Sequence, residues 1–234
     1  MSRKGLILFI ACGIAWGLPY AFIAIALEEF DVATIVLARC LIGVAVLLPF
    51  AIYRKAIMPA LKHWRWVLVF ALLEMVGPWF LITNAERTIS SGLTGLLIAI
   101  VPFWGVFIAY YFLGDKSVKH PKTIFGLVIG FVGVLLLVGV DALTANLDLI
   151  GVGSVILASV GYAIAPAVSS RTIGHLDSAG VIALSMVFVS IIYAVPGFAA
   201  LPASLPNATF DGWMALIVLG VVCSAVAFIL FFDL

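Results

Sequence analysis

A single carboxyl group inside a long apolar run is the feature of this sequence most suited to chemistry. Glu74 is the only charged residue between Arg65 and Glu86. An ionised carboxylate is costly in a hydrocarbon environment, so such a residue usually faces a cavity or a partner. A carboxyl that takes up and releases a proton there could couple solute movement to a proton gradient. The alternatives are a structural partner for Arg39 and a neutral acid held by hydrogen bonds.

Arg39 is the second charged residue embedded in an apolar run. At a helical rise of about 1.5 Å per residue, Arg39 lies roughly 9 Å from the start of the run 33–53, on the outer side of the membrane. Glu74 lies about 12 Å from the start of the run 66–85, on the inner side. With this offset, a direct ion pair between the two side chains is one of the alternatives. Arg39 could also stabilise the fold, extend outward to the interface or bind a carboxylate through its planar guanidinium.

Aromatic, polar and proline residues in the same runs complete the candidates for solute contact or coupling. The whole set is Glu74, Arg39, Trp16, Tyr20, Trp79, Asn84, Pro102 and Tyr162. Trp16 and Tyr20 are four residues apart and so share one face of a helix. Trp79 follows Glu74 by five residues, about 140° around an α-helix, which favours a different face. Packing against other side chains or lipid is the alternative for each aromatic residue.

Proline residues interrupt several of the apolar runs. Pro19, Pro78 and Pro102 lie inside the first, third and fourth runs, and Pro166 lies inside the sixth. A proline frees a backbone carbonyl and bends its helix, and transporters place such interruptions near binding sites. A packing bend without ligand contact is the alternative.

The apolar runs are long enough to predict an all-α integral membrane protein. Of the 234 residues, 65% are hydrophobic and 10% are charged, and the mean hydropathy is +1.32. A soluble domain carries about 25% charged residues, and a membrane span needs about 20 apolar residues. Eight spans are predicted, at residues 5–27, 33–53, 66–85, 91–113, 123–140, 150–170, 179–198 and 212–232. Pro121, Pro202 and Pro206 are expected in the loops between them.

Lys and Arg are distributed unequally between the two ends of these spans. Ten of the 12 lie in the N-terminal segment or in the loops 54–65, 114–122 and 171–178, and only Arg87 lies in a loop on the opposite side. Cytoplasmic loops carry the excess of positive charge. The N-terminus is therefore expected on the cytoplasmic side, as is the end at Leu234 because the number of spans is even.

Several function classes find little support in the composition. The net charge of +1 offers no basic patch for nucleic acid. The three cysteines lack metal-site spacing and the three histidines stand singly in predicted loops, so no metal or cofactor is expected and an integral-membrane enzyme is disfavoured. Nothing resembles the filter of a channel. The predicted partners are a small-molecule solute and the lipid bilayer. The residues concerned are Cys12, Cys40, Cys223, His63, His120 and His175.

The chain contains a predicted internal repeat with a shift of about 146 residues. Matching landmarks are Gly5 with Gly151, Trp16 with Tyr162, Asp31 with Asp177 and Trp66 with Trp213. A repeat of five spans is odd in number, so its second copy must insert with inverted topology, as in many secondary transporters. The predicted units are 1–146, with five helices, and 147–234, with three, which implies a truncated ten-helix protein. Coincidence among apolar helices is the alternative.

The segment 90–103, in which a helix of small residues reaches Pro102, resembles the fourth helix of EamA-type proteins of the drug/metabolite transporter superfamily. The turn Leu113-Gly114-Asp115 follows, with Asp where the family usually has Glu. The next helix is also similar, and so are residues 15–17 and Arg39. Gly126, Gly130 and Gly133 of that next helix are predicted to let helices pack closely, within the fold or at the face of a homodimer.

This resemblance implies a ten-helix fold of two inverted five-helix repeats. It also implies a secondary carrier or exporter in the bacterial inner membrane, acting on amino acids, other metabolites or drug-like solutes, with no substrate fixed. A non-transporting accessory or sensor protein is the alternative.

Overall fold

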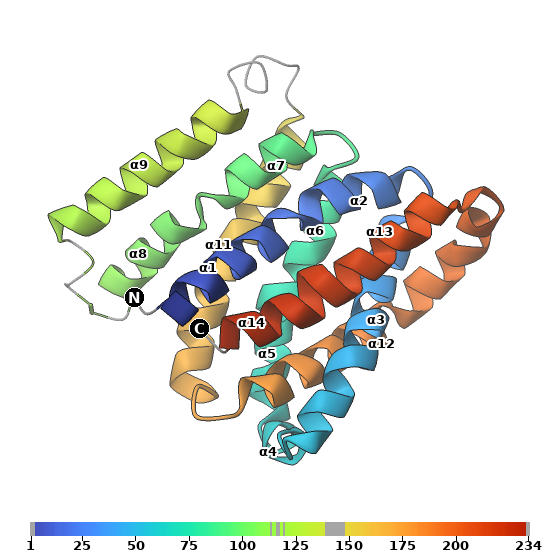
Figure 1. Ribbon diagram of the computed structural model, residues 1–234, viewed down its shortest axis with the longest axis horizontal. Coiled ribbons are helices and arrows are strands. Elements are labelled where there is room, and N and C mark those ends of the chain that lie inside the picture. The colour runs from blue at the N-terminus through green and yellow to red at the C-terminus, as the bar shows by residue number, and fades with distance from the viewer. Residues whose placement is uncertain (1–2, 113, 116–117, 119, 139–147, 233–234) are drawn as a thin grey trace.

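The computed structural model of the protein is a bundle of long helices (Figure 1). It describes residues 3–112, 114–115, 118, 120–138 and 148–232. Within these residues, seven helical segments are long and apolar enough to cross a membrane, and an eighth apolar helix is shorter. The prediction of an all-α membrane protein is therefore confirmed. The predicted boundary between residues 146 and 147, the predicted span ends at 113 and 140, and Leu113 of the predicted turn lie outside the described residues.

The helices follow the order of the predicted spans. The first five spans are α1 (Arg3–Gly17) with α2 (Pro19–Leu27), α3 (Val32–Tyr53), α5 (Trp64–Ala71) with η1 (Leu72–Val76) and α6 (Gly77–Ala85), α7 (Ser91–Ile98) with α8 (Val101–Tyr111), and α9 (Pro121–Val138). A short helix, α4 (Ile57–Lys62), lies in a predicted loop. The last three spans are α11 (Leu149–Thr172), α12 (Ser178–Ser204) with η3 (Leu205–Asn207), and α13 (Phe210–Gly220) with η4 (Val221–Val226) and α14 (Ala227–Phe232).

Three of the four predicted proline interruptions coincide with breaks in the spans. Pro19 begins α2, and Pro78 and Pro102 lie in the first two positions of α6 and α8. A proline is harmless there because the first turn of a helix has no internal partner for the missing N–H. Pro166 instead lies inside the unbroken α11.

The prediction that Pro202 lies in a loop is wrong. Pro202 lies inside α12, which continues past the predicted end at residue 198 to Ser204. Helices in membrane proteins tolerate internal proline because neighbouring groups satisfy the freed backbone carbonyl, so proline alone did not mark the end of this span.

Helices α3 and α12 pack against each other as an antiparallel pair. An added Cβ on the glycines between them would touch the facing helix or its flanking turn, at Gly197 against Ala33 and Leu37, at Gly43 against Met186, and at Gly180 against Ala56. Rising numbers on α3 meet falling numbers on α12, so the two helices run in opposite directions. The Thr34 hydroxyl adds a hydrogen bond to the Gly197 carbonyl at 2.9 Å.

The two helices of this pair begin in the same way. The carboxylate of Asp31 accepts a hydrogen bond from the Ala33 backbone N–H, and that of Asp177 accepts one from the Ala179 backbone N–H, both at 2.9 Å. An aspartate at this position satisfies one of the unpaired N–H groups of the first turn. Residues matched by the predicted repeat thus have the same local role.

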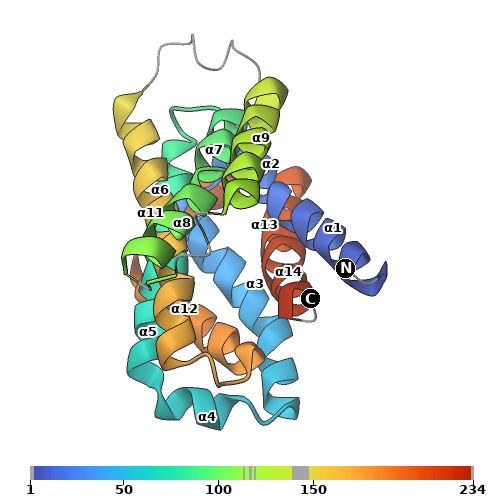
Figure 2. The same cartoon turned by 90° about the vertical axis from the view of Figure 1, so that its left-hand side faces the viewer.

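Helices α8 and α9 lie at the edge of the bundle, with α9 beyond α7 (Figures 1 and 2). None of the residues of α8 is buried. An added Cβ at Gly126, Gly130 or Gly133 of α9 would meet no atom within 4 Å. Close packing within the fold was one of the two predicted roles of these glycines. Within the described part of the chain, no helix packs closely against them. Their role at a homodimer face stays a prediction.

Candidate functional site

A cavity of about 570 Å³ lies inside the bundle. Its walls come from spans one to four and six to eight, and it extends along the bundle to the loop between α11 and α12. The lining residues are Trp16, Pro19, Tyr20, Ile23, Arg39, Phe70, Glu74, Trp79, Ile82, Ile98, Val101, Tyr162, Pro166, Ser169, Ile173, Gly174, Leu176, Ser178, Val181, Ile182, Phe228 and Phe231. Most are apolar or aromatic, with Arg39 and Glu74 as the charged types among them.

Glu74 reaches the cavity from the π-helical segment η1. In this segment the backbone N–H of Gly77 donates to the Leu72 carbonyl, five residues back rather than four. The wider turn brings residues five apart closer in direction, which explains why Trp79 also lines the cavity although α-helical geometry favours a different face. The Oε2 atom of Glu74 is buried and has no hydrogen-bond partner among the described residues. A buried carboxyl with an unpaired oxygen is stable when it is protonated or when a hydrogen-bond donor binds it.

Arg39 is buried in the cavity wall with 7% of its surface exposed. Its Nε donates to the Ser224 hydroxyl at 2.7 Å, and its Nη2 lies 3.5 Å from the Cys223 carbonyl. The guanidinium carbon lies 3.8 Å from the centre of the Trp79 ring, a cation–π geometry. No ion pair joins Arg39 to Glu74, both of which lie in the described part of the chain.

The aromatic candidates gather around the same space. Trp16, Tyr20, Tyr162 and Trp79 all line the cavity. Trp16 contacts the rings of two residues near the described end of the chain, with centroids 5.9 and 5.1 Å apart. These two residues are Phe228 and Phe231.

Six of the eight predicted site residues therefore share one cavity, while Asn84 and Pro102 do not line it. The cavity is also lined by residues that no sequence pattern singled out, among them Phe70, Ser169, Phe228 and Phe231. No signal distinguished these phenylalanines from many others facing lipid. Ser224, a polar residue in an apolar span, offered a signal for its contact with Arg39.

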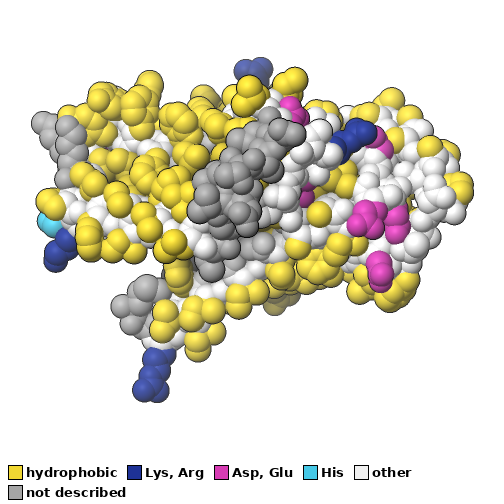
Figure 3. All heavy atoms as spheres, turned by 90° about the horizontal axis from the view of Figure 1, so that it is seen from above, with side chains coloured by type: hydrophobic (Ala, Val, Ile, Leu, Met, Phe, Trp, Pro, Cys, Tyr) yellow, Lys and Arg dark blue, Asp and Glu magenta, His cyan; other side chains and the backbone are white. Residues whose placement is uncertain are grey.

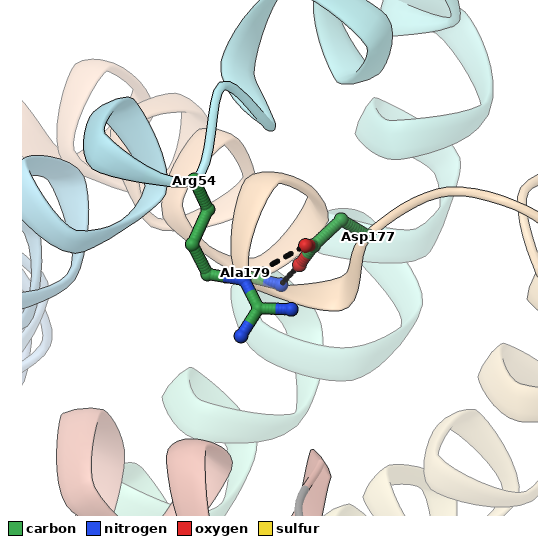
Figure 4. A network of polar contacts seen from close by, with 3 residues as sticks. All are labelled: Arg54, Asp177 and Ala179. Atoms are coloured by element: carbon green, nitrogen blue, oxygen red, sulfur yellow. Dashed lines mark hydrogen bonds and ion pairs between the residues drawn. The ribbon is translucent and has the colours of Figure 1, made fainter.

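The end of the cavity at the α11–α12 loop is held by a polar contact (Figure 4). Arg54, which follows α3, donates from Nε to the Asp177 carboxylate at 2.8 Å. Asp177 uses its other oxygen to cap α12, and its neighbours Leu176 and Ser178 line the cavity. The pair is partly exposed, with 48% and 31% of the side chains accessible, so its contribution to stability is small.

The outer surface of the bundle agrees with a lipid environment. Hydrophobic side chains cover a large part of the face drawn in Figure 3, and acidic side chains cluster towards one end of it. No group of three or more His, Cys, Asp or Glu that could hold a metal ion occurs among the described residues. Fold, surface and cavity together define a multi-pass helical membrane protein with an internal site of solute size.

Comparison with known proteins gives the family. Residues 3–139 match the EamA-like transporter family, and the chain belongs to this family. It is 25% identical over 222 residues to the "Uncharacterized transporter YvbV" of Bacillus subtilis (strain 168), covering 94% of this chain and 72% of that one. A protein of known crystal structure shares the fold with a TM-score of 0.75 and 19% identity, over 99% of this chain and 78% of that one. The protein is thus a membrane transporter.

Proposed function

We propose that the protein is a secondary carrier that exports or exchanges small metabolites, such as amino acids or drug-like solutes, with Glu74 coupling their movement to protons. The observation that carries the proposal is a cavity inside the bundle into which a carboxyl group with an unpartnered oxygen projects. Its volume of about 570 Å³ lies within the range of roughly 300–1,000 Å³ found for small-molecule sites.

The lining supports a solute that is partly apolar and carries a polar end. Aliphatic and aromatic side chains make up most of the lining, while Arg39 and Glu74 supply charge. Arg39 already has partners in Ser224 and Trp79, whereas no described residue bonds to Oε2 of Glu74. Glu74 is therefore the group with capacity to bind a proton or a donor on the solute.

Two inverted units, 1–146 and 147–234, are part of the proposal. Alternating access in such carriers arises from movement of one repeat against the other around a fixed site. The antiparallel packing of α3 and α12 supports the inversion, because they are the second spans of the two units. So does the pairing of first with third spans, α2 beside α13 and α11 beside α6.

The proposed location is the bacterial inner membrane with the N-terminus in the cytoplasm. Arg54 and the α11–α12 loop lie on the basic side of the bundle, which the distribution of positive charge assigns to the cytoplasm. Because the cavity extends to this loop, the conformation described here is inward-facing in that orientation.

Counterflow in proteoliposomes tests the function. The purified protein is reconstituted with a panel of labelled amino acids, and uptake is measured with and without an imposed pH gradient. Glu74→Gln should abolish the effect of the gradient while leaving the protein in the membrane. Glu28→Gln, the same change on an exposed residue outside the cavity, is the matched control. Wild-type rates and pH dependence in Glu74→Gln would refute the role of Glu74, and no flux of any panel member would contradict transport of amino acids.

A further inference from the structure

Two π-helical segments occupy corresponding places in the third and the eighth span. Segment η1 (Leu72–Val76) follows α5, and η4 (Val221–Val226) follows α13. The shift of 147 residues that places Trp66 on Trp213 also places Val76 on Cys223. A π-helical turn disturbs the regular pattern of backbone bonds, and in a membrane each carbonyl that loses its partner needs another donor.

Tyr193 of α12 supplies a donor to the first of these segments. Its hydroxyl donates to the Val76 carbonyl at 2.9 Å, and 9% of its surface is exposed. Its ring stacks on Phe80, with centroids 6.3 Å apart and planes inclined by 27°. Tyr193 does not line the cavity, so it contacts η1 from outside the cavity.

Arg39 of α3 makes the equivalent contact with the second segment. Its Nη2 lies 3.5 Å from the Cys223 carbonyl, the counterpart of the Val76 carbonyl. Its Nε donates to the Ser224 hydroxyl, which in turn donates to the Leu219 carbonyl at 2.8 Å. The second span of each half therefore binds the π-helical segment in the third span of the other half.

The contact of Tyr193 bears directly on Glu74. The Val76 carbonyl lies two residues after Glu74 within the same π-helical segment. In η1 the Gly77 N–H donates to the Leu72 carbonyl in place of the regular α-helical bond, and Pro78 directly after it has no N–H to donate. The direction of the Glu74 carboxyl thus depends on what binds η1 from outside.

We propose that Tyr193 is a positioning residue that acts on Glu74 through the Val76 carbonyl, as Arg39 acts on the opposite π-helical segment. The inference rests on the proposed function, in which Glu74 carries the proton. Among the described residues, Tyr162 of α11 interacts electrostatically with Glu74, and Tyr20 of α2 and Arg39 of α3 line the same cavity. All three are left in place when only the Tyr193 hydroxyl is removed.

Infrared difference spectroscopy of the protonated Glu74 carboxyl tests this role. The band is assigned by its loss in Glu74→Gln, and its pH midpoint is measured in purified protein in lipid, without any solute. Tyr193→Phe keeps the ring on Phe80 and should move the midpoint by at most about 1 pH unit, because the lost hydrogen bond ends on the Val76 carbonyl rather than on Glu74 itself. Tyr53→Phe, at a residue with 86% exposure, is the matched control and should match wild type.

A Tyr193→Phe midpoint equal to that of wild type would overturn the proposal. If this variant fails to fold, replacement of Tyr193 by 3-fluorotyrosine decides in its place, because it keeps the ring and the hydroxyl but changes the strength of the hydrogen bond to Val76. A shift supports the positioning role and an unchanged midpoint refutes it. A protein that moves no solute but shows the shift would contradict the proposed function alone. Absence of any titrating Glu74 band would overturn both.

Discussion

The substitution Gly161→Ala examines how closely α11 approaches the segment that carries Glu74. A Cβ added at Gly161 would lie 2.7 Å from the Leu73 carbonyl oxygen and 3.1 Å from Cγ of Pro78. Ordinary contacts begin at 3.4 Å, so the two backbones would have to separate by the difference of about 0.7 Å. The obstacle is a backbone carbonyl rather than the end of a flexible side chain, so it has little freedom to move aside.

The expected magnitude follows from two opposing effects. Overpacking a close contact of this kind costs about 1–3 kcal/mol. Replacing glycine by alanine inside a helix gains about 1 kcal/mol. Gly153→Ala makes the same change in the same helix, where an added Cβ would meet nothing within 4 Å, so it keeps the gain without the cost. The two variants should differ in unfolding free energy by about 1–3 kcal/mol.

Thermal unfolding of both variants in one detergent measures the difference. At about 2–4 °C per kcal/mol for a chain of this size, Gly161→Ala should unfold roughly 2–12 °C below Gly153→Ala. Equal unfolding temperatures would show that α11 does not pack against η1 as tightly as the 2.7 Å contact indicates.

Three further predictions concern carboxyl groups at the ends of the spans. Burial raises the pKa of Glu86 to about 9 from 4.5. Because the folded state binds the proton more tightly, stability should fall as the pH rises between these two values. Glu86→Gln should remove this dependence of the unfolding temperature on pH, and an unchanged dependence would contradict the prediction. Hydrogen bonds from Thr88 and the backbone lower the pKa of Asp148 from 3.8. The wild-type protein should therefore lose stability as the pH falls below about 4, whereas Asp148→Asn should not show this loss. Unfolding temperatures that fall in parallel with pH in both proteins would contradict this prediction. Asp177→Ala removes both the helix cap and the ion pair with Arg54, so it should cost about 1 kcal/mol more than Arg54→Ala, which removes only the partly exposed ion pair; equal losses on denaturation would show that the cap contributes nothing.

The sequence by itself determined the fold class, the order of the spans and the two charged residues inside them. Apolar runs of about 20 residues have few alternatives to membrane helices, because backbone groups in lipid must be satisfied within the segment. The cost of a buried charge singled out Glu74 and Arg39 for the same reason. Both line the cavity.

Only the tertiary structure decided which residues meet and how they are held. The π-helical turns at η1 and η4 leave no pattern in composition, and the turn at η1 brings Trp79 to the same cavity as Glu74. Arg39 lies against Ser224 rather than Glu74, and Tyr193 reaches Val76 across the bundle. These contacts join residues more than 100 positions apart. Periodicity assigns a side chain to a face of its own helix, whereas its partner depends on the angle and close approach of another helix.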